Sequence, residues 1–166
     1  MSNQEIGVSG KDLDSFDSAL EILENEDIEK HLIFSILGKL YSFPSRLIGE
    51  IALYDAVYPL PLVPDYVPGV INRYSIPYAL FDIGLLLFST PSPRRKVLVL
   101  KEEIDRIAIL IDDVTGIADV TREMLLCIEK SADLDGTVSA TFSWNNSDVF
   151  VLDIQRIMAR ATDEVA

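Results

Sequence analysis

Short apolar segments separated by turn-forming residues limit this chain to a small set of folds. Clusters of Gly, Pro, Asn, Asp or Ser interrupt the apolar runs roughly every eight to twelve residues. A parallel sheet would need a helix between successive strands, and most of these intervals are too short to hold one. The pattern therefore predicts a mainly β protein built as barrels or a sandwich.

The apolar runs and their flanking residues also suggest where the elements lie. A glycine turn at Gly38-Lys39 joins the first two strands, and a second hairpin surrounds Tyr74. The predicted strands cover residues 31–37, 40–43, 50–54, 69–72, 75–82, 96–101, 104–114, 140–144 and 148–153. Helices or helical turns are expected over residues 12–25, 83–88, 121–126 and 154–161.

The first and last of these helices are amphipathic. Leu13, Phe16, Leu20 and Leu23 recur at helical spacing between acidic residues, which predicts an acidic N-terminal helix within an extension of residues 1–30. This helix either packs on its own domain, which we favour, or docks on a partner. Residues 31–166 then form the main domain, closed by a C-terminal helix.

Composition excludes several classes of protein. Of the 166 residues, 49% are hydrophobic, which suits a packed core and not a disordered chain. The apolar runs are too short to cross a membrane, no signal peptide is visible, and the single Cys127 suits a reducing compartment, so we expect a cytoplasmic protein. A net charge of -13 argues against binding to nucleic acid.

Residues that could support catalysis or hold a metal have simpler explanations. His31 has no nearby nucleophile and no second histidine, so we expect a structural role and no zinc site. Asp82, Asp112-Asp113 and Asp153 each follow an apolar strand, where a carboxylate commonly accepts backbone N–H groups of the next turn. No phosphate-binding loop or nucleophile motif is present. We expect no enzyme activity, no cofactor and no bound metal.

Four segments, in order and spacing, resemble CheW-type chemotaxis coupling proteins over roughly residues 31–160. They are Glu50-Ile51, the hairpin from Pro68 to Ile83 with Gly69-Val70-Ile71-Asn72, the segment Ile109 to Val120, and Val149 to Ile154. The resemblance implies two SH3-like five-stranded β-barrel lobes that share a core.

The resemblance also implies a function without chemistry. A CheW-like protein is an adaptor that couples the cytoplasmic tip of a methyl-accepting chemoreceptor to the regulatory domain of a CheA-type histidine kinase. The receptor-facing positions of the family fall here on Ile48, Glu50, Gly69, Val70, Asn72 and Tyr74. Glu50 and Val70 are expected close together on the receptor-facing side.

The chain differs from the family at the tip of the central hairpin. Coupling proteins usually have Asn-Leu-Arg-Gly there, whereas this chain has Asn72-Arg73-Tyr74-Ser75. Tyr74 therefore occupies the arginine position, and Arg73 is expected on the opposite face of the strand. This predicts weak binding to a standard receptor tip and a preference for a receptor with an apolar or neutral residue opposite Tyr74.

A second hypothesis is a ligand-sensing β-barrel that modulates a signalling partner. Barrel mouths are common ligand sites, and the segment from Tyr54 to Tyr66 is rich in aromatic residues and prolines. The only charged residues it offers are Asp55 and Asp65. A ligand site usually has several convergent polar groups, so the adaptor is the favoured hypothesis.

Overall fold

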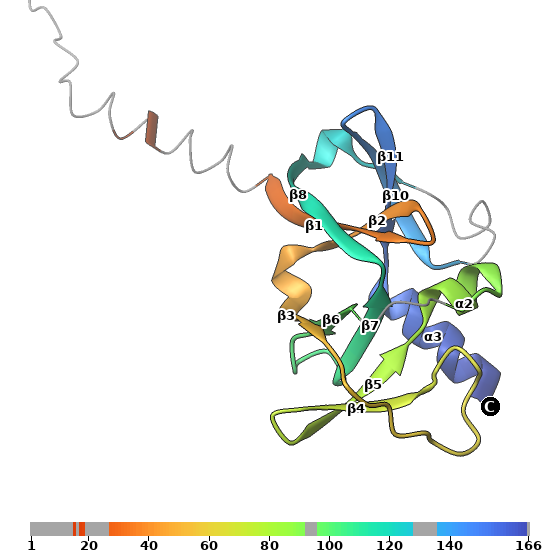
Figure 1. Ribbon diagram of the computed structural model, residues 1–166. Helices are drawn as coiled ribbons and strands as arrows, with labels where there is room; N and C mark the ends of the chain where they lie inside the picture. Colours follow the sequence, from red (N-terminus) through yellow and green to blue (C-terminus); the bar gives the residue numbers. More distant parts are fainter. Residues whose placement is uncertain (1–14, 16, 19–26, 92–95, 128–135, 166) are drawn as a thin grey trace, which may run out of the picture.

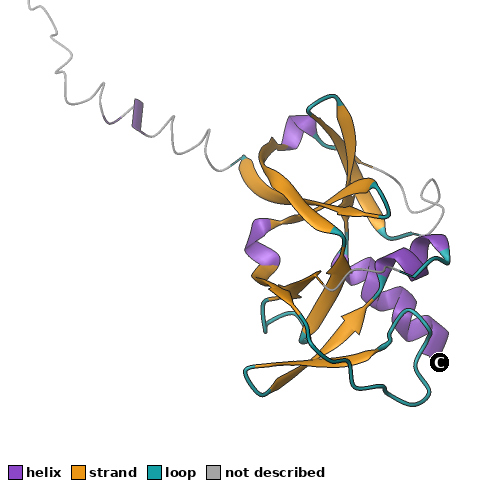
Figure 2. Cartoon of the chain, in the orientation of Figure 1, coloured by secondary structure: helices purple, strands orange, loops and turns teal. Residues whose placement is uncertain are grey.

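The computed structural model describes residues 15, 17–18, 27–91, 96–127 and 136–165. Within them, eleven strands form two sheets, and a few helices connect or cover these sheets (Figures 1 and 2). The expected N-terminal helix lies outside the described residues except at positions 15, 17 and 18, which are helical. The mainly β class is confirmed.

The strands are β1 (Ile28–Ile36), β2 (Lys39–Pro44), β3 (Ile48–Leu53), β4 (Gly69–Arg73), β5 (Ile76–Phe81), β6 (Lys96–Leu100), β7 (Ile107–Ile111), β8 (Asp113–Thr121), β9 (Leu126–Cys127), β10 (Val138–Trp144) and β11 (Ser147–Leu152). Among the described elements, the α-helices α2 (Ile83–Phe88) and α3 (Ile154–Val165) follow β5 and β11, and short 3-10 helices cover Ser45–Leu47 and Arg122–Met124. One sheet has the order β8-β1-β2-β11-β10-β9, and the other has β3-β6-β7-β5-β4.

Three hairpins turn over two residues that both have positive φ. These pairs are Leu37-Gly38, Tyr74-Ser75 and Asn145-Asn146. Positive φ at both central residues is the mark of a type I′ turn, whose twist matches that of the flanking strands. The expected turn at Gly38-Lys39 is thus shifted by one residue, and Tyr74 is part of a turn and not of a strand.

Each sheet receives a hairpin from the other half of the chain. The β1–β2 hairpin lies between β8, which pairs with β1, and β11, which runs parallel to β2. In the second sheet the β6–β7 hairpin lies between β3 and β5 in the same way. Residues 28–88 and 96–165 therefore repeat one arrangement of hairpin, further strands and helix, although no sequence repeat is visible.

The repeat also explains why one sheet has six strands where five were expected. After β8, the chain turns and adds β9 to the edge of β10. After β3, the chain turns in the corresponding way, but only Tyr58 pairs with Val70 of β4. Each sheet and its connections form one lobe. The lobe with the six-stranded sheet has the short strand β9 at the place where the other lobe has only the bridge between Tyr58 and Val70.

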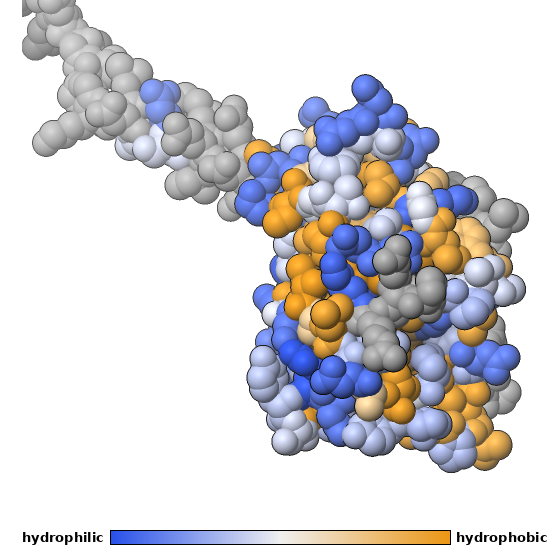
Figure 3. All heavy atoms as spheres, in the orientation of Figure 1, coloured by the Kyte–Doolittle hydropathy of each residue, from blue (hydrophilic) through white to orange (hydrophobic). Residues whose placement is uncertain are grey.

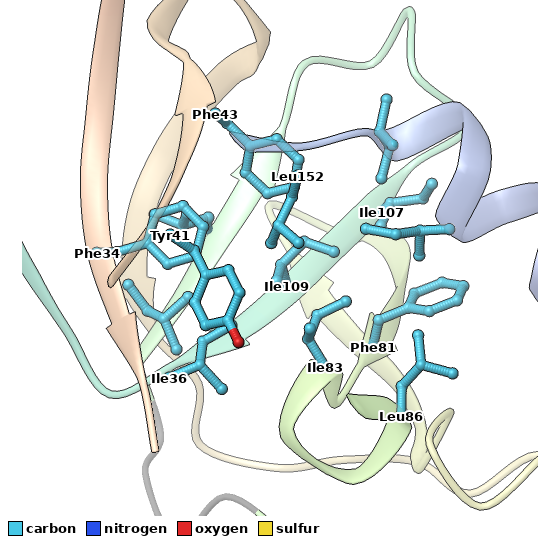
Figure 4. Close-up of a cluster of buried hydrophobic side chains, with 14 of the residues drawn as sticks. Phe34, Ile36, Tyr41, Phe43, Phe81, Ile83, Leu86, Ile107, Ile109 and Leu152 are labelled. Carbon is cyan, nitrogen blue, oxygen red and sulfur yellow. The ribbon is translucent and has the colours of Figure 1, made fainter. Parts of the chain in front are cut away.

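The two lobes share one core, as expected. Side chains from β1, β2, β5, β6, β7, α2 and α3 meet in a single buried cluster, part of which is drawn in Figure 4. Its fully buried members come from both sheets and include Phe34, Phe43, Ile83, Leu98 and Ile109. Each lobe also has a smaller cluster of its own, around Phe142 in one and Leu80 in the other. Because the largest cluster draws on both sheets, burial of apolar surface couples the two lobes.

An aspartate begins each α-helix at the end of a buried strand. Asp82 Oδ1 accepts a hydrogen bond from Leu85 N at 3.0 Å, and Asp153 Oδ1 accepts one from Gln155 N at 2.9 Å. The backbone N–H of each aspartate is also bonded, to Tyr66 O at 2.8 Å and to Thr137 O at 2.9 Å. The sequence-based interpretation of these two carboxylates as turn and cap residues is confirmed.

The strand expected over residues 104–114 is wrong in its extent. Asp105 and Arg106 both have positive φ and form a turn, so β7 begins at Ile107. The chain then leaves one sheet after Ile111 and enters the other at Asp113, where β8 starts. The predicted strand ran across this change because β7 is apolar and wholly buried, and Val114 restores the apolar character directly after Asp112 and Asp113.

Substitution of Gly69 by alanine should destabilise the fold strongly. A Cβ there would lie 2.2 Å from the carbonyl oxygen of Tyr58, and φ is +150°. Because backbone and not a flexible side chain must move, we expect a loss of roughly 2–4 kcal/mol of unfolding free energy in urea titration.

Gly38 provides the matched control, because it has φ +79° and a Cβ added there would meet no atom within 4 Å. Alanine there should cost about 1 kcal/mol, from backbone conformation alone. Equal losses for the two variants would contradict the close approach of Tyr58 to Gly69.

Candidate functional site

An ion pair between β3 and β4 lies at the centre of the candidate site. Arg73 Nε donates to Glu50 Oε2 at 3.3 Å, and Arg73 Nη2 donates to Glu50 Oε1. The two side chains are 24% and 30% exposed, so the pair is partly shielded from water. The hydrogen bonds to Glu50 are the main reason that the pKa of Arg73 is held above its ordinary value.

Strand alternation places Glu50 and Arg73 at the inner side of the lobe. On β3, Ile48 and Ala52 pack against core clusters, so Glu50 between them faces the same way. On β4, Ile71 is buried in the core of the lobe and Arg73 follows two residues later. The guanidinium therefore meets a carboxylate that strand geometry has already turned inward.

Tyr74 extends the site into solvent. It is 82% exposed and has φ +52° in the two-residue turn. The Arg73 guanidinium lies over the Tyr74 ring, 5.2 Å from its centroid. The same cation thus contacts a carboxylate and an aromatic face, which limits the conformations open to the hairpin tip.

A shallow hollow of about 360 Å³ opens beside this ion pair. Tyr78 and Val99 form part of its wall, and the turn after β6 contributes Lys101, Glu102 and Glu103. The hollow is therefore amphipathic, with an aromatic and aliphatic wall and charged groups at its border.

The six residues predicted from sequence do not share one face. Val70 and Asn72 alternate with Ile71 and Arg73, so their side chains lie on the other face of β4 from the ion pair. The expected proximity of Glu50 and Val70 on one side is not what the structure shows, because β4 turns Arg73 and not Val70 toward Glu50.

The other predicted positions have separate environments. Ile48 is partly buried against the shared core, and Asn72 is exposed. Gly69 is buried beneath Tyr58, where its lack of a side chain allows the two backbones to pair. Of the six positions, Glu50 and Tyr74 line the hollow.

Arg73 is the residue that sequence reasoning set aside. The argument that a one-residue shift sends it to the wrong face assumed a strand that continues through Tyr74, but β4 ends at Arg73. The signal that could have identified it is the short hairpin itself, since a two-residue turn at Tyr74-Ser75 makes Arg73 the last paired residue, opposite Ile76.

Comparison with known proteins agrees with this architecture. The family model of the CheW-like domain matches residues 30–162. The chain belongs to the CheW-like domain family. No curated protein gave a significant match.

Among solved structures, the chain is similar to the scaffolding protein TtCheW from Thermoanaerobacter tengcongensis. The TM-score is 0.66 at 13% sequence identity, and the match covers 76% of this chain and 84% of that one. At this identity, the likeness supports the fold, including two sheets and few helices.

The described residues contain no cluster of three or more His, Cys, Asp or Glu side chains able to hold a metal ion. Within the same residues, no helix combines the length and apolar character needed to cross a membrane. The segment proposed to line a ligand cavity has Tyr58, Leu60 and Leu62 exposed, while Tyr66 belongs to the shared core.

His31 has the structural environment that the sequence suggested. It is 2% exposed, its Nδ1 lies 3.1 Å from Ser42 Oγ, and its ring meets Phe142 edge to face. Burial lowers the pKa of His31 below its ordinary value, and this outweighs the opposing effect of Glu29. Burial therefore favours the neutral form of this imidazole.

A double-mutant cycle should measure the coupling between Glu50 and Arg73. Because the pair is partly exposed, we expect Glu50→Gln and Arg73→Met to show a coupling energy of about 1 kcal/mol in urea unfolding. The pair Lys30 and Asp119, with side chains 66% and 61% exposed, is the control and should couple more weakly. Equal coupling in the two pairs would show that shielding adds nothing at the candidate site.

The lone histidine should make stability depend on pH. Unfolded His31 takes up a proton near pH 6.5, whereas the folded chain does so only at lower pH, so the unfolded state holds more protons between these values. We therefore expect the unfolding free energy contributed by this group to fall as pH drops below about 6.5.

NMR titration of the single imidazole gives the folded pKa directly, and His31→Gln should reduce the pH slope of stability in that window. A folded midpoint at or above 6.5 would contradict the effect of burial.

Proposed function

We propose that this protein is a chemotaxis adaptor that couples a methyl-accepting chemoreceptor to a CheA-type histidine kinase through protein–protein contacts. The observation that carries this proposal is the CheW-like match over residues 30–162, since members of this family are scaffolds. A non-catalytic role and a cytoplasmic location are part of the same proposal.

The receptor tip is proposed to contact β3, β4 and the hairpin turn. Val70 is half-buried and Asn72 is exposed on one face of β4, and Tyr74 projects from its end. Such a surface offers an aliphatic, an amide and an aromatic contact in sequence, which suits the side of a helical hairpin. Three further residues support this surface from the inner side. Ile48 packs on the core, Glu50 fixes Arg73, and Gly69 allows the backbone of Tyr58 to approach β4.

Tyr74 is proposed to set which receptor binds. Its ring already packs with the Arg73 guanidinium, and Arg73 is engaged by Glu50. An acidic receptor residue opposite Tyr74 would therefore meet a ring with one hydroxyl instead of a free arginine. The preference for an apolar or neutral residue in the receptor stays a prediction.

The test is to titrate the purified chain separately with a receptor tip peptide and with the regulatory domain of the kinase. Binding of both, without nucleotide hydrolysis or phosphotransfer by the chain alone, is the expected result. Because coupling requires both partners, a chain that fails to bind the receptor peptide, or fails to bind the kinase domain, would overturn the coupling function.

Replacement of Val70 by aspartate should weaken receptor binding about tenfold or more, because a charge would be placed within an apolar contact. The change should leave the unfolding free energy within about 1 kcal/mol, because Val70 is only half-buried and belongs to none of the three hydrophobic clusters. Isothermal titration with the receptor peptide and urea unfolding measure the two effects.

Ser143→Asp is the matched control, because Ser143 is exposed on β10, which corresponds to β4 in the other lobe. It should bind receptor like the unmodified chain. Global unfolding of the Val70→Asp protein would mean that Val70 is a core residue, and the receptor surface would be misassigned.

A further inference from the structure

The connection between β3 and β4 is fixed at both ends. Tyr58 and Val70 exchange two backbone hydrogen bonds, of 2.8 and 2.9 Å. Further along, Tyr66 O accepts from Asp82 N at 2.8 Å, and Tyr66 and Val67 are buried in the shared core. Between these anchors, residues 59–62 are all exposed and Val63 already packs against the shared core, so we call residues 59–62 the apex.

The apex carries apolar side chains into solvent. Leu62 is 97% exposed and Leu60 is 41% exposed, beside Tyr58 at 54%. Apolar atoms gather at the lower right of Figure 3, the part of the view where this connection runs in Figure 1. Most large apolar side chains of a stable domain lie inside, so this grouping calls for a partner.

Leu62 is also the wrong residue for its backbone. It follows Pro61 in a turn and has φ +59°, a conformation that favours glycine or asparagine and costs leucine roughly 1 kcal/mol. Neither solvent exposure nor turn geometry explains a leucine here. Strained backbone conformations cluster at functional sites, which makes Leu62 a candidate for contact with a partner.

The apex is stiff before it binds anything. Pro59 and Pro61 restrict its backbone, and the chain that follows it is held by a hydrogen bond from Val67 N to Pro64 O at 2.9 Å. A segment ordered in advance loses little conformational entropy on association, which favours insertion into a pocket.

The charged residues near the apex indicate the chemistry of the partner's pocket into which it would insert. Asp55 and Asp65 are the only charged residues between positions 51 and 72, and both are exposed. The whole chain carries a net charge of -13, which opposes self-association through this surface. The complementary partner is a folded protein whose apolar pocket is bordered by Lys or Arg.

We propose that the apex is an anchoring surface, with Leu62 as its central side chain, for a folded partner that has an apolar, basic-rimmed pocket. This rests on the proposed coupling function, in which that partner is the regulatory domain of the kinase. The surface is separate from the hollow at Glu50 and Arg73, which has a different lining.

The test is titration of the full chain carrying Leu62→Asn with the kinase regulatory domain. Asparagine suits positive φ, so the variant should fold at least as stably as the unmodified chain. We expect its dissociation constant for the kinase domain to rise about tenfold or more, and that for the receptor tip peptide to change less than about twofold.

Leu126→Asn is the matched control, because Leu126 is 69% exposed on β9 in the other lobe. It should leave kinase binding within about twofold. Equal binding by Leu62→Asn and the unmodified chain would overturn the proposal, as would equal weakening by the two variants. If the unmodified chain binds no kinase domain at all, the coupling function itself fails and the anchor fails with it.

Salt dependence tests the basic rim. Binding of the unmodified chain should weaken as ionic strength rises, and a variant with both Asp55→Asn and Asp65→Asn should show a smaller dependence. An unchanged salt dependence in that variant would exclude a basic rim around the pocket.

Discussion

The exchange of hairpins between the two halves of the chain is the constraint on which the structure depends. β1 and β2 complete the sheet that contains β8 and β11, and β6 and β7 complete the sheet that contains β3 and β5. Neither half can close its own sheet, and the largest buried cluster takes side chains from both. The two lobes are therefore expected to fold together. Along the chain, the lobe made of β3 to β7 is inserted between β2 and β8 of the other lobe.

This arrangement also decides where partner surfaces can form. The strands of the exchanged hairpins are hydrogen-bonded on both sides within their sheets. The turns of the hairpins and the connections between strands therefore remain at the surface. The tip at Tyr74 and the apex at Leu62 are both of this kind, and both are held by β4. Gly69 links the two, since its open side allows Tyr58 to pair with β4 and so positions the connection that carries the apex.

Polar groups inside the lobes are used to fix geometry. His31 is paired with Ser42 in one lobe, and Glu50 with Arg73 at the border of the other. Asp82 and Asp153 join buried strands to the helices that cover the shared core. These contacts satisfy buried or half-buried polar groups and orient the elements.

The sequence alone determined the β class, most strands, the two cap aspartates and the structural histidine, because each follows from local spacing and turn chemistry. It also indicated the family through segments that run in order along the chain. Tertiary structure decided the remainder. Where β7 ends and β8 begins depends on which sheet each strand joins, and the single residue between them, Asp112, gives no local signal of the change of sheet. The pairing of Arg73 with Glu50 depends on where β4 stops and on the approach of β3, two facts that no single segment contains. The exposure of Leu62 could not be predicted from the sequence either. A leucine in a proline-rich segment is buried or exposed depending on which other parts of the folded chain cover it.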